Sequence, residues 1–367
     1  MASPVEKTSP PVSKIEQWIR PQIRALSAYH VAEPEGLIKL DAMENPYTWP
    51  PALVDAWLET LRGVGLNRYP DPDAGQLKER LREAFEIPAD MGVLLGNGSD
   101  ELIQMINLSL AVPGRVALAP EPTFSMYRII AASTGLTFTG VPLDGDFEMD
   151  LPAMLAAIET HRPAVIYIAY PNNPSGTLFD ASAVRALIEA APGLVVVDEA
   201  YYPYSGYTLM EDLPRYDNLL LLRTLSKVGL AGLRLGLLIG PGPWLEQINK
   251  TRLPYNIGIL AQVSADFALR NKAVFDDQIR RICSDREHLI GQLRLLEGIE
   301  VYSSHANFVL FRVAQGRAAQ LYDAIKAEGV LIRCFSAHEG PLADCLRVTV
   351  GTPEENEAFV RALRRAL

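Results

Sequence analysis

Between about residues 90 and 240, short and almost purely apolar segments alternate with helical patterns, and this alternation constrains the fold most strongly. Segments of Val, Ile and Leu suit strands buried on both faces, and a helix provides the crossover between two parallel strands. The pattern therefore predicts an α/β fold with a mostly parallel sheet and helices on both faces. The predicted strands are 115–119, 164–170, 194–197, 219–222 and 235–240, and the predicted helices are 99–111, 124–134, 181–191 (with Asp180 as N-cap) and 244–252.

After about residue 259 the pattern changes. A long helical stretch extends to residue 296 and is followed by a strand at 308–312, a helix at 318–328 and strands near Val330 and Leu346. This mixture predicts a smaller α+β domain at the C-terminal end. We expect an N-terminal tail and arm at 1–40, a large ligand-binding domain at 41–260, and a small domain at 261–367 that includes part of the arm.

Charge and composition exclude several classes of function. The 34 basic and 44 acidic residues give a net charge of −10 without a basic block, so nucleic acid and anionic membranes are not expected as partners. The longest apolar stretch, 219–239, contains Arg223, Lys227 and Arg234 and is too polar to span a bilayer. The first residues lack the apolar core of a secretory signal. The three cysteines lack metal-site or C-x-x-C spacing, so we expect a cytoplasmic protein without disulfide or metal.

Polar residues follow the predicted strands, at the edge of an open α/β sheet where ligands bind. One strand runs into Pro-Asn-Asn-Pro-Ser-Gly at 171–176, and later strands lead to Asp198 and to Lys227. A Pro-Asn-Asn-Pro sequence alone is typical of a tight turn. Asp198 is more informative, because a carboxylate at the end of an apolar strand is costly to bury without a partner. We therefore expect a buried positive partner for Asp198.

One cofactor, pyridoxal 5′-phosphate, accounts for the whole set, because it carries a ring nitrogen, an aldehyde, a phenolic oxygen and a phosphate. Asp198 would hold the proton on the ring nitrogen. Lys227 would form a Schiff base with the aldehyde and later move the proton at the substrate α-carbon. Tyr201 and Asn173 would hydrogen-bond the phenolic oxygen. Lys227, Asp198 and Tyr201 are thus the predicted catalytic residues.

Two elements are predicted to bind the phosphate. The first is the Ser226 hydroxyl together with the guanidinium of Arg234. The second is Gly-Asn-Gly-Ser-Asp-Glu at 96–101, which opens the following helix and leaves backbone N–H groups free for a dianion. Each residue also has an ordinary explanation, such as a solvated lysine, a surface arginine, or core aromatic side chains at Phe124 and Tyr127. Their occurrence at successive strand ends favours the cofactor site.

With these residues in place, the chain resembles the fold type I pyridoxal-phosphate aminotransferases, and most closely the histidinol-phosphate branch of that family. The resemblance covers about residues 29–360 and implies a seven-stranded type of sheet in the large domain. Its Glu-Asn-Pro and Arg-Tyr-Pro motifs are typical of the branch. The segments that carry the resemblance are 40–47 (LDAMENPY), 68–70 (RYP), 96–101, 120–127, 171–176, 198–201, 223–234 and 345–351.

The resemblance implies the cofactor roles already derived and adds others. The backbone amides of Ser99 and Asp100 match the family's phosphate-binding turn, and Phe124 matches the aromatic residue that stacks on the cofactor ring. Tyr69 matches a tyrosine that reaches the phosphate of the neighbouring subunit. The resemblance therefore implies a homodimer with shared active sites.

The resemblance also implies a reaction, in which an amino group is exchanged between L-glutamate/2-oxoglutarate and histidinol phosphate/imidazole acetol phosphate by ping-pong chemistry in histidine biosynthesis. Arg347 resembles the arginine that binds the substrate carboxylate. Arg333 best matches a second arginine, which binds the substrate phosphate, and guanidinium groups pair well with both anions. Asn45 and Tyr29 match an N-terminal segment that closes over the substrate in relatives.

Three features depart from the family pattern. Met43 replaces a polar residue, Ser175 replaces a threonine, and Arg234 follows Lys227 by one residue fewer than is common. Other functions stay open, namely transamination of aromatic amino acids (phenylalanine or tyrosine), a lyase resembling threonine-phosphate decarboxylase, and a ligand-sensing regulator. The regulator would need a DNA-binding module, and the residues before the matched region contain no basic helix-turn-helix.

Overall fold

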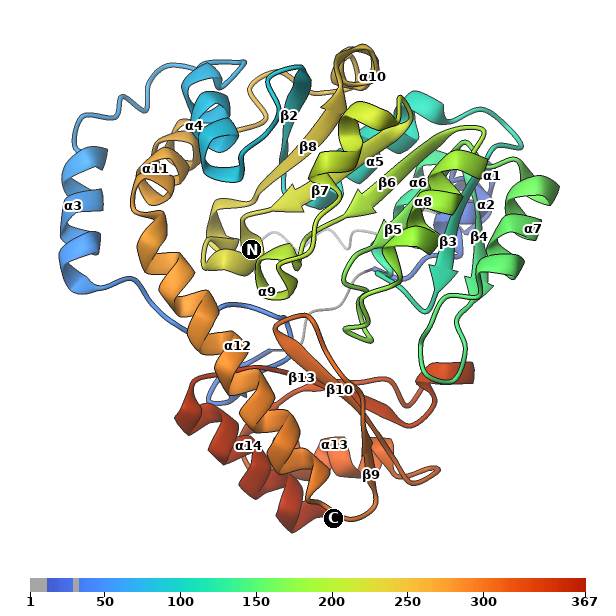
Figure 1. Ribbon diagram of the computed structural model, residues 1–367, viewed down its shortest axis with the longest axis vertical. Coiled ribbons are helices and arrows are strands. Elements are labelled where there is room, and N and C mark those ends of the chain that lie inside the picture. Colours follow the sequence, from blue (N-terminus) through green and yellow to red (C-terminus); the bar gives the residue numbers. More distant parts are fainter. Residues whose placement is uncertain (1–11, 29–32) are drawn as a thin grey trace, which may run out of the picture.

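A seven-stranded sheet forms the centre of the larger part of the molecule (Figure 1). The computed structural model describes residues 12–28 and 33–367. The strand order is β2-β8-β7-β6-β5-β3-β4, in which the last five strands are parallel and β8 runs antiparallel to both of its neighbours. The strands are β2 (Met91–Asn97), β3 (Val116–Glu121), β4 (Thr137–Pro142), β5 (Val165–Ala169), β6 (Leu194–Asp198), β7 (Leu219–Thr224) and β8 (Leu235–Pro241).

The inner strands are buried on both faces, which explains their nearly continuous apolar sequences. In β6, Val195 and Val197 belong to the core on one face, and Leu194 and Val196 belong to the core on the other. Helices α4, α7 and α8 contribute to the first core, and α5, α6 and α10 contribute to the second. These helices are α4 (Gly75–Phe85), α5 (Ser99–Leu110), α6 (Met126–Thr134), α7 (Leu151–His161), α8 (Ala181–Ala190) and α10 (Gly242–Asn249).

A smaller α+β unit follows, built on an antiparallel sheet of order β12-β13-β10-β9. Helix α12 leads from the large sheet to this unit and packs there against α14 (Figure 1). The N-terminal part of the chain joins it, because β1 pairs with β11. The elements are β1 (Ile38–Lys39), β9 (Ile299–Val301), β10 (Phe308–Val313), β11 (Val330–Leu331), β12 (Arg333–Cys334), β13 (Cys345–Thr349), α12 (Lys272–Arg294), α13 (Ala318–Ala327) and α14 (Pro353–Ala366); the other helices are α1 (Val12–Trp18), α2 (Pro21–Arg24), α3 (Pro51–Leu61), α9 (Tyr202–Ser205) and α11 (Ile259–Arg270).

The predicted mostly parallel sheet with helices on both faces and the smaller C-terminal α+β unit are confirmed. The two edge strands of the large sheet, β2 and β4, were not predicted, and neither were the short strands β1, β9 and β12. In β2 the apolar run is interrupted by Gly92 and Gly96, and β4 is too polar and exposed to read as a buried strand. The helical stretch predicted to reach residue 296 is in fact two helices. Asn271 separates them: its side chain donates to the carbonyl of Phe267 at 2.9 Å at the end of α11, and α12 begins at the next residue, Lys272.

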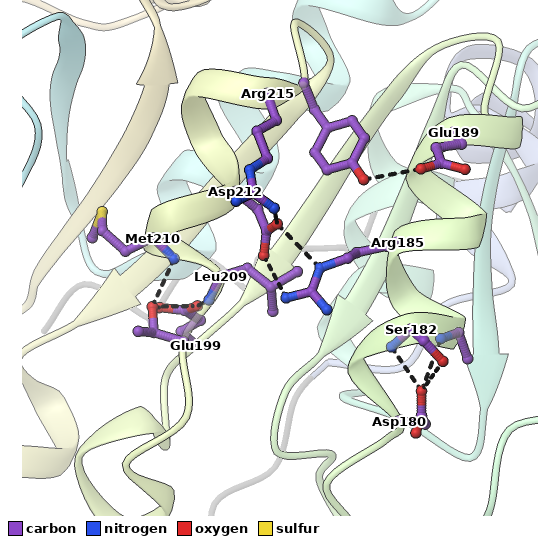
Figure 2. Close-up of polar contacts among 12 residues, drawn as sticks. Asp180, Ser182, Arg185, Glu189, Glu199, Leu209, Met210, Asp212 and Arg215 are labelled. Atoms are coloured by element: carbon purple, nitrogen blue, oxygen red, sulfur yellow. Dashed lines mark hydrogen bonds and ion pairs between the residues drawn. The ribbon is translucent and has the colours of Figure 1, made fainter.

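Among the described residues, three helices have a side chain as their N-terminal cap, and the first is α7, where the Asp150 carboxylate accepts from the N–H of Ala153. Asp180 caps α8 as predicted, and its carboxylate accepts hydrogen bonds from the N–H groups of Ser182 and Ala183 (Figure 2). Thr352 and Glu355 form a capping box at the start of α14. Across residues 12–28 and 33–367, no helix is long and apolar enough to cross a membrane.

Removal of the Thr352 cap should destabilise the protein. In Thr352→Ala, α14 loses the hydroxyl that accepts from the Glu355 N–H, and the free energy of unfolding is expected to fall by about 1 kcal/mol. Urea unfolding followed by circular dichroism measures the loss. Thr60→Ala is the control, because the Thr60 hydroxyl donates only back to its own exposed helix at Ala56. Equal losses in the two variants would contradict the capping role.

Candidate active site

A cavity of about 200 Å³ lies where β5, β6 and β7 end, at the edge predicted to bind ligands. Its wall also includes the N-terminus of α5 and residues 42–44 from the N-terminal part of the chain. Nine of the ten predicted cofactor residues line it, namely Ser99, Asp100, Phe124, Asn173, Asp198, Tyr201, Ser226, Lys227 and Arg234. The structure thus brings these residues together in one place.

Asp198 is the buried carboxylate of this cavity. Its side chain accepts hydrogen bonds from the hydroxyl of Tyr127 at 2.7 Å and from the N–H of Ala200 at 3.1 Å. Burial raises the pKa of the carboxyl to about 6, and these hydrogen bonds oppose the rise. Among the described residues, both of its hydrogen-bond partners are neutral donors. The positive partner expected from the sequence is therefore not one of the side chains that hold Asp198.

Lys227 lies in the short helical turn Ser226–Val228 that follows β7. Its Nζ donates to the carbonyl oxygen of Ala42 at 3.3 Å. Burial, together with the positive charge of Arg347, lowers the pKa of the Lys227 ammonium group to about 8, while the carboxylate of Glu44 opposes this change. Near neutral pH the ammonium form still predominates, but the neutral amine, which is the form that attacks an aldehyde, is far more populated than in an ordinary lysine.

Asn173, Tyr201 and Arg347 form a hydrogen-bonded chain. Nδ2 of Asn173 donates to the hydroxyl oxygen of Tyr201 at 3.1 Å, and the guanidinium of Arg347 donates to Oδ1 of Asn173. Arg347 also donates to the carbonyl oxygen of Asp41 at 3.1 Å. Burial raises the pKa of Tyr201 above its ordinary value, so the hydroxyl keeps its proton and is able to donate it to an anionic oxygen.

The N-terminus of α5 and the turn that carries Arg234 form an anion-binding end of the cavity. Gly98 has φ +82°, and a Cβ there would lie 2.7 Å from Nη2 of Arg234, so glycine lets the guanidinium approach the turn. No side chain caps α5, and its first N–H groups suit an anion. The hydroxyls of Ser226 and Thr224 are 2.7 Å apart beside it. The shortened spacing after Lys227 does not keep Arg234 out of the cavity.

Two residues of the site were not assigned from the sequence. The sequence does not decide whether Tyr127 belongs to the hydrophobic core or to the site. In the structure its side chain is fully buried, donates to Asp198, and stacks on Tyr167 with ring centroids 4.8 Å apart. Thr224 was not singled out, although it lines the cavity. A signal for Tyr127 was present, because it lies three residues after Phe124 and so on the same side of a helical turn.

The predicted substrate residues Arg347 and Arg333 are neighbours. They face each other in the antiparallel register of β13 and β12, and the side chain of Arg333 is exposed. Asn45 lies beside the turn that follows Lys227. A Cβ at Gly229 would be 3.0 Å from Nδ2 of Asn45, and this amide also donates to Oε1 of Gln278 at 2.9 Å.

The remaining predicted residues have other surroundings. Tyr69 does not line the cavity of its own chain; it is 79% exposed and stacks on Tyr255 with ring centroids 4.3 Å apart. Tyr29 lies outside the described residues. Of the two unusual side chains, Met43 is buried against the cavity, and Ser175 is buried within the loop after β5.

The donor set of the cavity fits pyridoxal 5′-phosphate. A buried carboxylate held only by neutral donors suits a protonated ring nitrogen, and an amine of lowered pKa suits an aldehyde. The tyrosine and asparagine donors suit a phenolic oxygen. An uncapped helix N-terminus with a nearby arginine suits a phosphate. Each polar group of the cofactor thus has a counterpart among residues of this cavity.

Comparison with known proteins shows the family of the chain. The sequence model of the family described as aminotransferase class I and II matches residues 35–363. The chain is 58% identical to histidinol-phosphate aminotransferase 2 of Nitrosococcus oceani, over 96% of this chain and 98% of that protein. It is 49% identical to histidinol-phosphate aminotransferase 2 of Cupriavidus pinatubonensis, over 97% and 98%.

The fold is also that of a solved structure, histidinol-phosphate aminotransferase from Sinorhizobium meliloti in complex with pyridoxal-5′-phosphate. The TM-score is 0.83 at 24% identity, with 94% of this chain and 96% of that chain covered. The match to the family model and the two relatives extends over nearly the whole chain. The chain therefore belongs to the class I and II aminotransferases that use pyridoxal 5′-phosphate, and within them to the histidinol-phosphate aminotransferase family.

Proposed function

We propose that this chain exchanges the amino group between L-glutamate/2-oxoglutarate and histidinol phosphate/imidazole acetol phosphate, as a step of histidine biosynthesis. The observation that carries the proposal is the gathering of Asp198, Lys227 and Arg234 around one cavity. The choice of substrate is supported by the curated relatives, which bear the name histidinol-phosphate aminotransferase and match almost the entire chain.

When bound, pyridoxal 5′-phosphate draws electrons from the substrate α-carbon and carries the amino group between the two half-reactions. Lys227 would hold the cofactor at its aldehyde carbon, and its neutral amine, once free, would take up and return the proton at the substrate α-carbon. The ionised carboxylate of Asp198 holds the proton on the ring nitrogen. Tyr201 and Asn173 donate hydrogen bonds to the phenolic oxygen and keep the cofactor ring oriented.

Two arginines of the small sheet are proposed to bind the acidic groups of the substrates. Arg347 is held at the cavity by its hydrogen bond to Asn173, and Arg333 stands across from it on the neighbouring strand. A planar guanidinium pairs with both carboxylates and phosphates, so one pair of arginines would serve glutamate and a phosphate ester in turn. Asn45 is proposed to cover the substrate from the N-terminal side, next to Gly229.

A homodimer with shared active sites is part of the proposal. Tyr69 is exposed and stacked on Tyr255, and Leu66 and Leu253 are 70% and 72% exposed. Exposed apolar side chains of this kind are typical of a surface that a second copy covers. Tyr69 would then reach the phosphate site of the partner. The cytoplasmic location and the domain boundaries at residues 40 and 260 stay predictions.

Transamination of aromatic amino acids is the second candidate. Two phenylalanines flank the substrate-binding guanidinium, with the Cζ of Arg347 5.1 Å from the ring centre of Phe308 and 5.7 Å from that of Phe335. Such surroundings suit a phenyl ring as well as an imidazole ring. A lyase resembling threonine-phosphate decarboxylase would use the same cofactor residues, and it differs in leaving no aminated cofactor after one half-reaction.

Replacement of Lys227 should abolish the reaction. In Lys227→Ala the protein loses both the covalent link to the cofactor and the amine that moves the α-proton, so turnover is expected to fall by about 10⁴-fold or more. The turnover rate with histidinol phosphate and the visible absorbance of the bound cofactor measure the effect. Lys250→Ala, at an exposed lysine directly after the end of α10, serves as the control. Turnover near the wild-type rate in Lys227→Ala would rule out the assignment.

Asp198→Asn should stabilise the cofactor-free protein while it impairs function. The folded pKa of about 6 exceeds the ordinary value of 3.8, so the stability that this carboxyl contributes is full below pH 3.8 and is lost as pH rises through 6. At pH 8 the variant's free energy of unfolding should exceed that of wild type by on the order of 1–3 kcal/mol. Urea unfolding at pH 8 and pH 4 tests this, because the gain should shrink at pH 4. An equal gain at both pH values would contradict the burial argument.

Arg333→Ala should separate the two candidate functions. Loss of one charged hydrogen-bonding partner of a phosphate is expected to lower kcat/KM for histidinol phosphate by about 10- to 100-fold, while phenylalanine, which has no phosphate, is little affected. Conversion of the cofactor is followed by visible absorbance with each substrate alone. Arg361→Ala, at an exposed position of α14, is the control. If wild type prefers phenylalanine, the aromatic function replaces the histidinol-phosphate one.

A further inference from the structure

A buried ion pair lies directly behind the active site and has no part in the chemistry described so far. Nη2 of Arg223 is 2.7 Å from Oε2 of Glu199, and the two side chains are 3% and 0% exposed. Nε of Arg223 donates to the same carboxylate at 2.9 Å. Burying two charges is costly even when they pair, and an apolar pair of similar size is often as stable. The position of this pair therefore needs an explanation other than stability.

Further hydrogen bonds satisfy both charges. The Glu199 carboxylate accepts from the N–H of Leu209 at 2.7 Å and from the hydroxyl of Thr208 at 2.9 Å (Figure 2 shows Glu199 beside Leu209). Nη2 of Arg223 also approaches Oγ1 of Thr208 at 2.8 Å, and its guanidinium carbon lies 3.9 Å from the ring centre of Tyr202. The pair is thus held rigidly from several sides.

The pair joins the two strand ends that carry the catalytic residues. Glu199 directly follows Asp198 at the end of β6, and Arg223 directly precedes Thr224 near the end of β7. Because strand side chains alternate between faces, Asp198 and Thr224 point to the cavity while the ion pair lies on the opposite face. The N–H of Glu199 also donates to the carbonyl of Leu222 at 2.8 Å, which extends the pairing of the strands past Asp198.

We propose that Glu199 and Arg223 are positioning residues, which fix the Asp198 carboxylate relative to the Lys227 amine when the cofactor binds between them. The inference rests on the proposed cofactor site but not on the choice of substrate. Asp198 is the last residue of β6, and Lys227 lies in the turn that follows β7. A shift of one strand end relative to the other would therefore change the distance between the Asp198 carboxylate and the Lys227 amine, and with it the contacts of both groups to the cofactor. Small misplacements of catalytic groups reduce rates strongly.

A second ion pair nearby provides a matched control. Arg185 on α8 approaches Asp212 with Nη2–Oδ2 and Nε–Oδ1 distances of 2.9 and 3.1 Å, and the side chain of Asp212 is 3% exposed (Figure 2). This pair resembles the first in chemistry and in the burial of its carboxylate. However, it joins a helix to the segment Met210–Arg215, and neither residue adjoins a residue of the cavity.

The test compares Glu199→Gln with Asp212→Asn in the cofactor-loaded protein. The first readout is the pH midpoint of the visible absorbance of the bound cofactor, which reports the proton near Lys227 and needs no substrate. Glu199→Gln is expected to shift this midpoint by about 0.5 pH unit or more and to lower kcat by about tenfold with KM little changed. Asp212→Asn should lower the melting temperature but leave the midpoint and kcat as in wild type. Equal midpoints in both variants and wild type would overturn the proposal.

A double variant separates position from stability. Glu199→Met/Arg223→Met leaves no buried charge, so its melting temperature should return toward that of wild type while the absorbance midpoint stays shifted. If the midpoint and kcat return as well, the pair is structural only and the proposal fails. Should Glu199→Gln not fold, this double variant carries the test alone. A wild-type protein that shows no visible cofactor band would instead overturn the proposed function itself.

Discussion

The carboxylate of Asp198, buried at the end of the central strand β6, is the charge around which the rest of the site is organised. β6 has three strands on either side, so water has little access to its end. Tyr127 and Ala200 donate hydrogen bonds to this carboxylate without cancelling its charge. Its raised pKa expresses the cost of that burial. A protonated ring nitrogen beside the carboxylate would offset this cost, so the burial that raises the pKa of Asp198 also favours a cationic partner.

At the ends of β6 and β7, one face of the large sheet carries residues of the cavity and the other face carries the buried ion pair. Asp198 and Thr224 project toward the cavity, and their chain neighbours Glu199 and Arg223 meet on the other face. The alternation of side chains along a strand makes this division possible within two consecutive residues. The ion pair and the cavity are therefore connected through the backbone of two paired strands.

The site also depends on the junction of two sheets. Most residues of the cavity come from the large unit, whereas Arg347 belongs to the small sheet and reaches across to Asn173 in the loop after β5. Asn173 in turn bonds Tyr201. A side chain of the small unit and two residues of the large one are thereby linked in one hydrogen-bonded chain beside the cavity. The packing of the small unit on the large one therefore sets where the Arg347 guanidinium lies relative to Asn173 and Tyr201.

The sequence by itself determined the parallel core and nine residues of the cavity, because apolar strands, strand-end polar residues and family motifs are local patterns. Only the tertiary structure decided that Tyr127 bonds Asp198 and that Glu199 pairs with Arg223, and it alone split the long helix at Asn271. The first two are contacts between residues far apart in sequence, set by strand register and helix packing. Local patterns carry no information on such contacts, since each partner alone has the appearance of an ordinary core tyrosine or surface charge.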